Sequence, residues 1–145
     1  MPTKKPYPGL VPPNIADIRP YVPGKPIEEV ERELGVTAIK LASNENALGP
    51  SPKAMEAIRE CLAGTNRYPD AGGYYLREKL AAVHKVEMDQ IVLGAGSTEL
   101  ILLLGEIYLG PGRNGLTSVG TFVVFPMSAR LAGAETLTVP LRNYA

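Results

Sequence analysis

The sequence predicts an α/β fold, in which parallel strands alternate with crossover helices, from three observations in residues 91–145. Short apolar runs typical of buried parallel strands occur three times, at Ile91–Gly94, Leu116–Val119 and Thr136–Leu141. Between them lie two apolar stretches of helical length, Glu99–Gly110 and Val123–Ala132. A glycine-rich turn joins the first run directly to the first of these stretches. We therefore expect a layer of strand, helix, strand, helix, strand, with a sheet that is incomplete within this chain.

The residues before this layer predict an arm and three helices. Residues 1–24 contain seven prolines, a density that excludes a helix and favours an extended arm. Helix signals then follow at residues 26–35, 51–64 and 74–85, with proline or serine at the first two starts and glycine at their ends. A short strand is expected at Ile39–Ala42. Two apolar stripes predict buried helix faces, the first Met55, Ile58 and Leu62, the second Leu76, Leu80 and Val83.

The overall composition limits the class of protein. The 145 residues are 45% hydrophobic and carry 15 basic and 15 acidic side chains, so no net charge favours nucleic acid or an anionic membrane as partner. No apolar run approaches the roughly 18 to 20 residues of a membrane span. The proline-rich start lacks the apolar core of a secretory signal, and the single Cys61 excludes an internal disulfide framework. These features predict a soluble, cytoplasmic protein.

The turn Gly94-Ala95-Gly96-Ser97-Thr98-Glu99 is the one motif that indicates chemistry. Small residues at a strand–helix junction let an anion approach the free N–H groups of the first helical turn, and the two hydroxyls add donors. Glu99 stands where the dinucleotide fingerprint has its third glycine, so a single phosphate suits the turn better than a pyrophosphate. Tight packing of strand on helix explains the glycines equally well from this motif alone.

Five segments, in order along the chain, resemble the histidinol-phosphate aminotransferases, which are class I/II, fold type I enzymes that use pyridoxal phosphate. One of the five departs from the family pattern, since Ala47 stands where proline is common. The resemblance covers nearly the whole chain, through the segments Arg19–Gly35, Lys40–Pro52, Asn66–Asp70 with the helix after it, Ile91–Ile101 and Thr121–Glu135.

The resemblance implies a domain organisation and a cofactor site. Residues 1–24 would be the arm, 25–90 part of the small domain with connecting helices, and 91–145 the first part of the cofactor-binding large domain. Gly96, Ser97 and Thr98 would hold the phosphate of pyridoxal 5'-phosphate, and Phe122 would stack on its ring. Without the resemblance, Phe122 reads more simply as a core aromatic residue.

The remaining site residues implied by the resemblance act between subunits or on the substrate. Tyr68 would reach from one subunit to the cofactor phosphate of the other, although a locally packed Tyr-Pro turn is an equal reading of its spacing. Tyr21 would cap the substrate pocket of the neighbouring subunit, and Asn44 would line the substrate side. These roles imply a homodimer with two sites completed reciprocally.

The family's catalytic groups do not occur in this sequence. The lysine that forms the Schiff base with the cofactor, the aspartate for its ring nitrogen and the arginine for the substrate carboxylate are all expected after residue 145. The sequence therefore predicts no catalytic residue and no metal site in this chain, and the chain alone is expected to be inactive and poorly stable.

Four functions remain open from the sequence. The first is the amino-terminal portion of an enzyme that transfers an amino group between histidinol phosphate, as amino donor, and 2-oxoglutarate, a 2-oxo acid, in histidine biosynthesis. The second is another fold type I enzyme, either a different aminotransferase or an amino-acid phosphate decarboxylase. The third is a non-catalytic partner that dimerises with a complete homologue. The fourth is an unrelated phosphate-binding α/β module. It would require the resemblance of the four segments other than the glycine-rich turn to be accidental.

Overall fold

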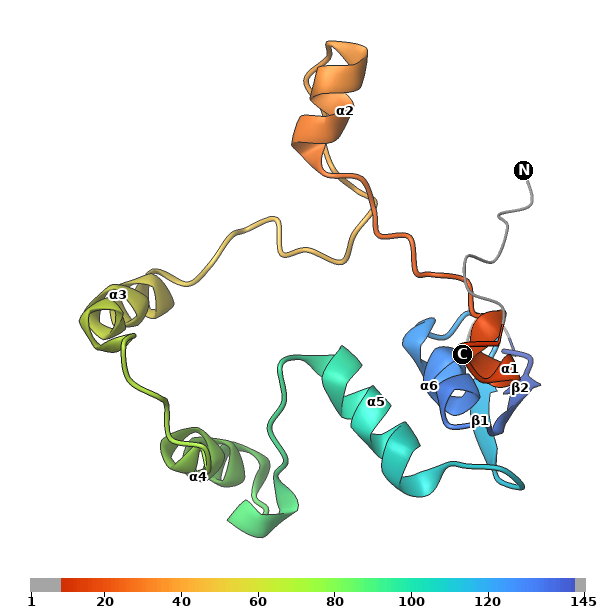
Figure 1. Cartoon of the computed structure of the whole chain (residues 1–145). Coiled ribbons are helices and arrows are strands. Elements are labelled where there is room, and N and C mark those ends of the chain that lie inside the picture. The colour runs from red at the N-terminus through yellow and green to blue at the C-terminus, as the bar shows by residue number, and fades with distance from the viewer. Residues whose placement is uncertain (1–8, 143–145) are drawn as a thin grey trace. The chain divides into compact units, whose positions relative to one another are not determined.

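The structure is a computed structural model that describes residues 9–142. The chain divides into two units (Figure 1), and each is described by itself. The sheet unit comprises Met1–Tyr21 and Glu87–Ala145, and the helical unit comprises Val22–Val86. The assignment of residues 1–24, 25–90 and 91–145 to an arm, a small domain and a large domain stays a prediction.

The sheet unit contains two parallel strands joined by a crossover helix. Strand β1 (Asn114–Ser118) pairs with β2 (Glu135–Val139), and Leu116 lies opposite Leu137 in the register. Helix α6 (Val124–Leu131) connects them and contacts both strands. Helix α5 (Ser97–Tyr108) precedes β1 and packs against α6. The predicted α/β class with parallel strands is confirmed.

Two predicted strands are absent from the described residues. Neither Ile39–Ala42 nor Ile91–Gly94 forms a strand, and β1 and β2 are the only paired strands in residues 9–142. An apolar run becomes a strand only when a neighbouring strand supplies ladder partners for its N–H and C=O groups. Ile91–Gly94 has the apolar character of a strand, but no neighbouring strand pairs with it in the described residues. A 3₁₀ turn, η2 (Met88–Gln90), precedes it.

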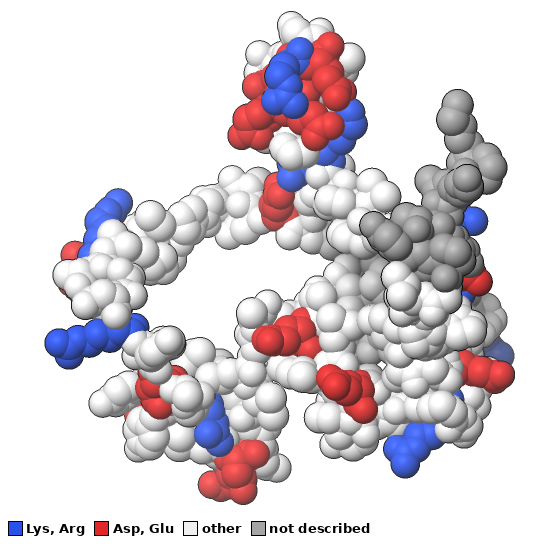
Figure 2. Space-filling view, in the orientation of Figure 1, with Lys and Arg blue, Asp and Glu red and all other residues white. Residues whose placement is uncertain are grey.

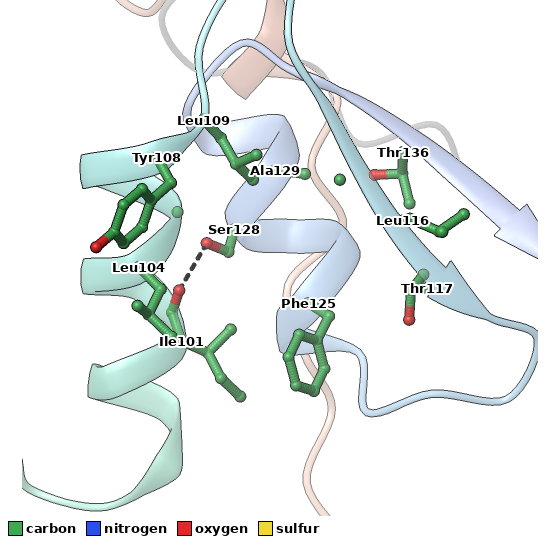
Figure 3. A pocket seen from close by; sticks show the side chains of 12 residues that line it. Ile101, Leu104, Tyr108, Leu109, Leu116, Thr117, Phe125, Ser128, Ala129 and Thr136 are labelled. Atoms are coloured by element: carbon green, nitrogen blue, oxygen red, sulfur yellow. Dashed lines mark hydrogen bonds between the residues drawn. The ribbon is translucent and has the colours of Figure 1, made fainter. Parts of the chain in front are cut away.

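The core of the sheet unit lies where α5 and α6 meet. The buried apolar side chains among the described residues are Val124 and Ala129, and the polar Ser128 is buried beside them. The Ser128 hydroxyl donates a hydrogen bond to the carbonyl oxygen of Ile101 at 3.0 Å (Figure 3). Gly105 of α5 is also buried and faces Ser128 directly. A Cβ at Gly105 would overlap the Ser128 hydroxyl. The two helices therefore approach closely through small residues.

The helical unit contains the three helices that the sequence predicts. They are α2 (Ile27–Leu34), α3 (Pro52–Cys61), continued by a 3₁₀ turn, η1 (Leu62–Gly64), and α4 (Tyr74–His84). Gly35 ends α2 in the left-handed conformation with φ of 65°, as a C-terminal glycine is expected to do. Figure 2 shows acidic and basic side chains intermixed over α2. Lys25 and Glu33 form one such pair of opposite charges, with Nζ and the carboxylate oxygen 2.6 Å apart. This hydrogen bond raises the pKa of Lys25.

The predicted burial of the two apolar stripes is wrong in this chain. Met55 and Leu80 are half-buried, but Ile58, Leu62, Leu76 and Val83 are 54%, 59%, 54% and 63% exposed. Within the described residues, α2, α3 and α4 make no substantial contacts with one another. A stripe marks which helix face is apolar, but burying that face requires a second element to pack on it.

The proline-rich arm contains one turn of helix, which the proline density was expected to exclude. Helix α1 (Pro13–Ala16) places Pro13 at its first position, where a missing N–H costs no intrahelical bond. The N–H groups of Ile15 and Ala16 both donate to the carbonyl of Pro12 at 3.0 Å. From Ile18 to Gly24 the arm has neither helix nor strand, as predicted, and its residues 1–8 lie outside the described residues. None of the helices in residues 9–142 has the length and apolarity that crossing a membrane requires.

Candidate phosphate-binding turn

The start of α5 presents an open turn suited to a phosphate. Gly96 is the N-cap residue, and its φ of 94° with ψ of 175° is a conformation that glycine adopts far more easily than other residues. No atom lies within 4 Å of the position a Cβ would take at Gly96, so the space beside it is free. Ser97 and Thr98 are exposed at the first two helical positions, where backbone N–H groups lack intrahelical acceptors. The turn therefore offers donors and space to an anion.

The two glycines of the turn serve different purposes. A Cβ at Gly94 would lie 2.9 Å from both the Glu99 carboxylate and the Leu100 side chain, so glycine lets these side chains pack close to the turn. Glu99, in the first turn of α5, accepts a hydrogen bond from the Ala95 N–H and ties the turn to the helix. Of the two readings left open by the motif, packing accounts for Gly94, whereas the free space at Gly96 favours anion binding.

Phe122 is available as a stacking surface. It lies immediately before α6, and its carbonyl accepts the N–H of Phe125 at 3.0 Å. Its side chain is 42% exposed in this structure. The backbone of Phe122 is thus held by the first turn of α6 while part of the ring remains free.

The predicted cross-subunit and substrate residues are all exposed. Tyr68 is fully exposed, Tyr21 is 56% exposed, and Asn44 is exposed. Tyr68 is therefore not packed locally, which favours a contact outside its own turn. The sheet unit contains Gly96, Ser97, Thr98, Phe122 and Tyr21, and the helical unit contains Asn44 and Tyr68.

Asp70 organises the loop that carries Tyr68, a role that the sequence interpretation missed. Its two carboxylate oxygens accept the N–H groups of Gly72 at 2.9 Å and Tyr74 at 2.7 Å. The signal in the sequence is an aspartate shortly before a helix start and followed by glycines. This pattern is typical of an Asx turn, in which the aspartate side chain accepts backbone N–H groups. The Tyr74 bond, followed by the Gly72 bond, lowers the pKa of Asp70.

This pKa shift predicts an acid-sensitive loop. Because the folded pKa lies below the unfolded value of about 4, the carboxylate stabilises the loop fully above that value. The contribution is lost as the pH falls through the lower folded pKa. NMR titration should show the amide signals of Gly72 and Tyr74 following Asp70 protonation.

Variants at Asp70 separate its charge from its hydrogen bonds. Asp70→Asn should keep one acceptor and abolish the titration, whereas Asp70→Ala should disorder the start of α4 at neutral pH. Asp89→Asn is the matched control, since Asp89 is an exposed aspartate elsewhere in the chain. Unchanged Gly72 and Tyr74 signals in Asp70→Ala would contradict the capping role.

An apolar pocket of the sheet unit does not coincide with this turn. It measures about 290 Å³ and lies between α5, α6 and β1, where Figure 3 shows side chains such as Leu104, Leu116 and Phe125 around it. None of the predicted site residues lines it. Its lining is apolar and partly exposed, with Leu116 70% exposed, and the lack of convergent charges does not suit a phosphate. Residues 9–142 also contain no cluster of three His, Cys, Asp or Glu side chains placed to hold a metal.

Comparison with solved structures defines the class. The chain matches the crystal structure of histidinol-phosphate aminotransferase from Sinorhizobium meliloti in complex with pyridoxal-5'-phosphate, with a TM-score of 0.79 and 26% identity over 93% of this chain and 36% of that one. Its fold is therefore part of a fold type I pyridoxal-phosphate transferase.

Comparison with curated sequences shows which proteins the chain is similar to. The chain is 46% identical over 138 residues to histidinol-phosphate aminotransferase 2 of Pseudomonas fluorescens and 48% identical over 135 residues to the Anaeromyxobacter enzyme. These matches cover 93% and 92% of this chain but only 37% of each relative. No protein-family model matches the chain. The chain is thus homologous to histidinol-phosphate aminotransferases, as a part that spans about a third of their length.

Proposed function

We propose that the chain is the amino-terminal portion of a cytoplasmic, homodimeric aminotransferase. The complete enzyme would transfer an amino group between histidinol phosphate and 2-oxoglutarate in histidine biosynthesis. The observation that supports this most strongly is the 46–48% identity to proteins of that name over more than nine-tenths of the chain. The open turn at Gly96 and the half-exposed ring of Phe122 suit the cofactor that the solved relative contains.

In this proposal the chain's own residues bind and orient the cofactor. The N–H groups and hydroxyls of Ser97 and Thr98 donate to the phosphate, and Gly96 leaves room for it. Phe122 covers one face of the ring, which fixes its tilt. When bound, pyridoxal phosphate supplies an electron sink for the amino-acid carbon.

The second subunit would complete each site. Tyr68 of one subunit would donate its hydroxyl to the cofactor phosphate of the other, and Tyr21 would cover the neighbouring substrate pocket. Asn44 would line the substrate side. Exposure of all three side chains leaves them free for such contacts.

The proposal is tested first by the DNA sequence downstream of the Ala145 codon. We expect the frame to continue, or to resume after one frameshift, into an Asn-Pro-x-Gly segment and a Ser-Lys motif. The protein expressed from that whole frame should bind pyridoxal phosphate and convert histidinol phosphate faster than other amino donors. A true stop codon with no such coding sequence nearby would refute the enzyme and favour a non-catalytic partner. Preference for another donor would instead indicate a different fold type I enzyme.

Glu99 gives a direct test of where the phosphate binds. Its carboxylate places a negative charge beside the turn while accepting the Ala95 N–H. Glu99→Gln keeps an acceptor oxygen but removes the charge, so the affinity for pyridoxal phosphate should rise by about two- to fivefold, from a helix-terminus effect of about 0.3–1 kcal/mol. Glu99→Ala also loses the hydrogen bond and should bind more weakly than Glu99→Gln.

Binding titrations of the parent protein and the Glu99 variants, with pyridoxal phosphate and with pyridoxal, measure this change in affinity. The gain should appear only with the phosphorylated compound. Glu106→Gln, at an exposed position near the other end of α5, is the matched control and should leave both affinities unchanged. An equal gain with pyridoxal, or no gain with either compound, would place the phosphate elsewhere.

A further inference from the structure

Backbone hydrogen bonds close the carboxyl end of α6, but they do not include the carbonyl of Leu131. Gly133, with φ of 74°, donates to the Arg130 carbonyl at 3.1 Å, and Ala134 donates to the Ala129 carbonyl at 2.9 Å. These two bonds form the usual glycine-terminated helix end. The carbonyl of Leu131 belongs to the last turn, where no intrahelical donor is available.

Asn14 of the arm completes this helix end. Its side-chain amide donates to the carbonyls of Leu131 at 3.2 Å and Arg130 at 2.9 Å. In return, the Nε of Arg130 donates to the backbone carbonyl of Asn14 at 3.0 Å. Three hydrogen bonds thus join two segments that are 116 residues apart in sequence, and α1 and α6 are in contact in the same unit.

The attachment is confined to a short part of the arm. Asn14, Ile15, Ala16 and Ile18 are half-buried. On either side the arm is exposed, with Leu10 at 74% and Val22 at 83%. Since only residues 14–18 are held, the chain that follows is free to extend from this point.

The attachment limits where Tyr21 can lie. Five residues from Ala16 to Tyr21 span at most about 18 Å even when fully extended. Pro20 further restricts the backbone of this stretch. Tyr21 must therefore remain within that distance of Ala16, two residues after the Asn14 that is bonded to the carboxyl end of α6.

We infer that Asn14 and Arg130 are positioning residues whose reciprocal hydrogen bonds fix the arm on α6 and thereby set the point from which Tyr21 extends to a second copy of the chain. The role of Tyr21 rests on the proposed function, but the attachment itself does not.

Hydrogen exchange on the full chain tests the attachment, with Asn14→Asp as the variant. Aspartate has the same shape but cannot donate, and its charge faces the negative end of the helix dipole. The amides of Ile15, Ala16 and Ile18 should exchange roughly tenfold faster, because the two side-chain hydrogen bonds that hold the arm are lost and a carboxylate faces the helix-end carbonyls. The amides of β1 and β2 should keep their rates. Asn66→Asp, an equal charge change at an exposed loop position, should change neither set.

A second readout separates positioning from a structural role. A nitroxide at the exposed position 19, directly after the held residues, on an Arg19→Cys and Cys61→Ser background, should give a restricted electron paramagnetic resonance line shape. The line shape should become mobile in Asn14→Asp, and partly so in Arg130→Lys, which keeps the charge but lacks the Nε donor.

Each outcome is decisive for the attachment. Equal arm exchange in the parent chain and Asn14→Asp, or parallel loosening of the arm and both strands, would overturn the inference. Pyridoxal phosphate binding by the parent chain is measured separately. A failure there would count against the proposed function and leave the attachment intact.

Discussion

Gly105→Ala is expected to lower the free energy of unfolding of the sheet unit by about 2 kcal/mol. A Cβ at this position would lie 1.8 Å from the Ser128 hydroxyl oxygen and 3.1 Å from its Cβ. Both residues are buried in the middle of packed helices, so neither backbone can move away cheaply. Such overpacking costs about 3 kcal/mol, while the better helix propensity of alanine returns about 1 kcal/mol.

Hydrogen exchange of α5 and α6 amides measures the effect, and a loss of about 2 kcal/mol corresponds to roughly 30-fold faster exchange. Ser128→Ala alone should cost about 1 kcal/mol through its bond to Ile101. Combined with Gly105→Ala, it removes the closest overlap and should restore part of the loss, a coupling that a double-mutant cycle isolates. Gly110→Ala is the control, since no atom lies within 4 Å of a Cβ there. Equal effects at positions 105 and 110 would contradict the close approach.

The chain by itself is expected to self-associate and to unfold without a sharp cooperative transition. Only Val124 and Ala129 are buried apolar residues among those described, whereas many large apolar side chains are more than half exposed. The two-stranded sheet also leaves the outer edge of each strand without a partner in the described residues. So small a core leaves the isolated chain only marginally stable against the conformational entropy of ordering it.

Size-exclusion chromatography with light scattering should report a mass at least twice the 15.5 kDa of the monomer. Leu116→Lys, which places a charge beside the apolar cavity of the sheet unit, should reduce association. Leu48→Lys is the matched control at a loop position that is 95% exposed, and it should have less effect. A monodisperse monomer with a cooperative thermal transition would refute this expectation.

The helices show how far local signals reach. Pro26 to Gly35 and Ser51 to Gly64 define α2 and α3 to within a few residues, because caps, proline starts and glycine stops act within one helical turn. The same reasoning failed at Ile91–Gly94, where apolar character was right for a strand but no partner strand pairs with it in the described residues. It also failed at Pro13, because the first helical position tolerates proline.

The sequence by itself determined the α/β class, the parallel pairing of β1 and β2, and the similarity to histidinol-phosphate aminotransferases. The phosphate at the Gly96 turn stays a prediction. The fold class depends on short-range spacing and the similarity on matching segments, and both are written in consecutive residues. Only the tertiary structure decided that Gly94 and Gly96 serve different purposes and that Gly105 meets Ser128. It alone showed that Asn14 closes the end of α6, because that contact joins residues 116 positions apart and depends on how the chain folds back on itself.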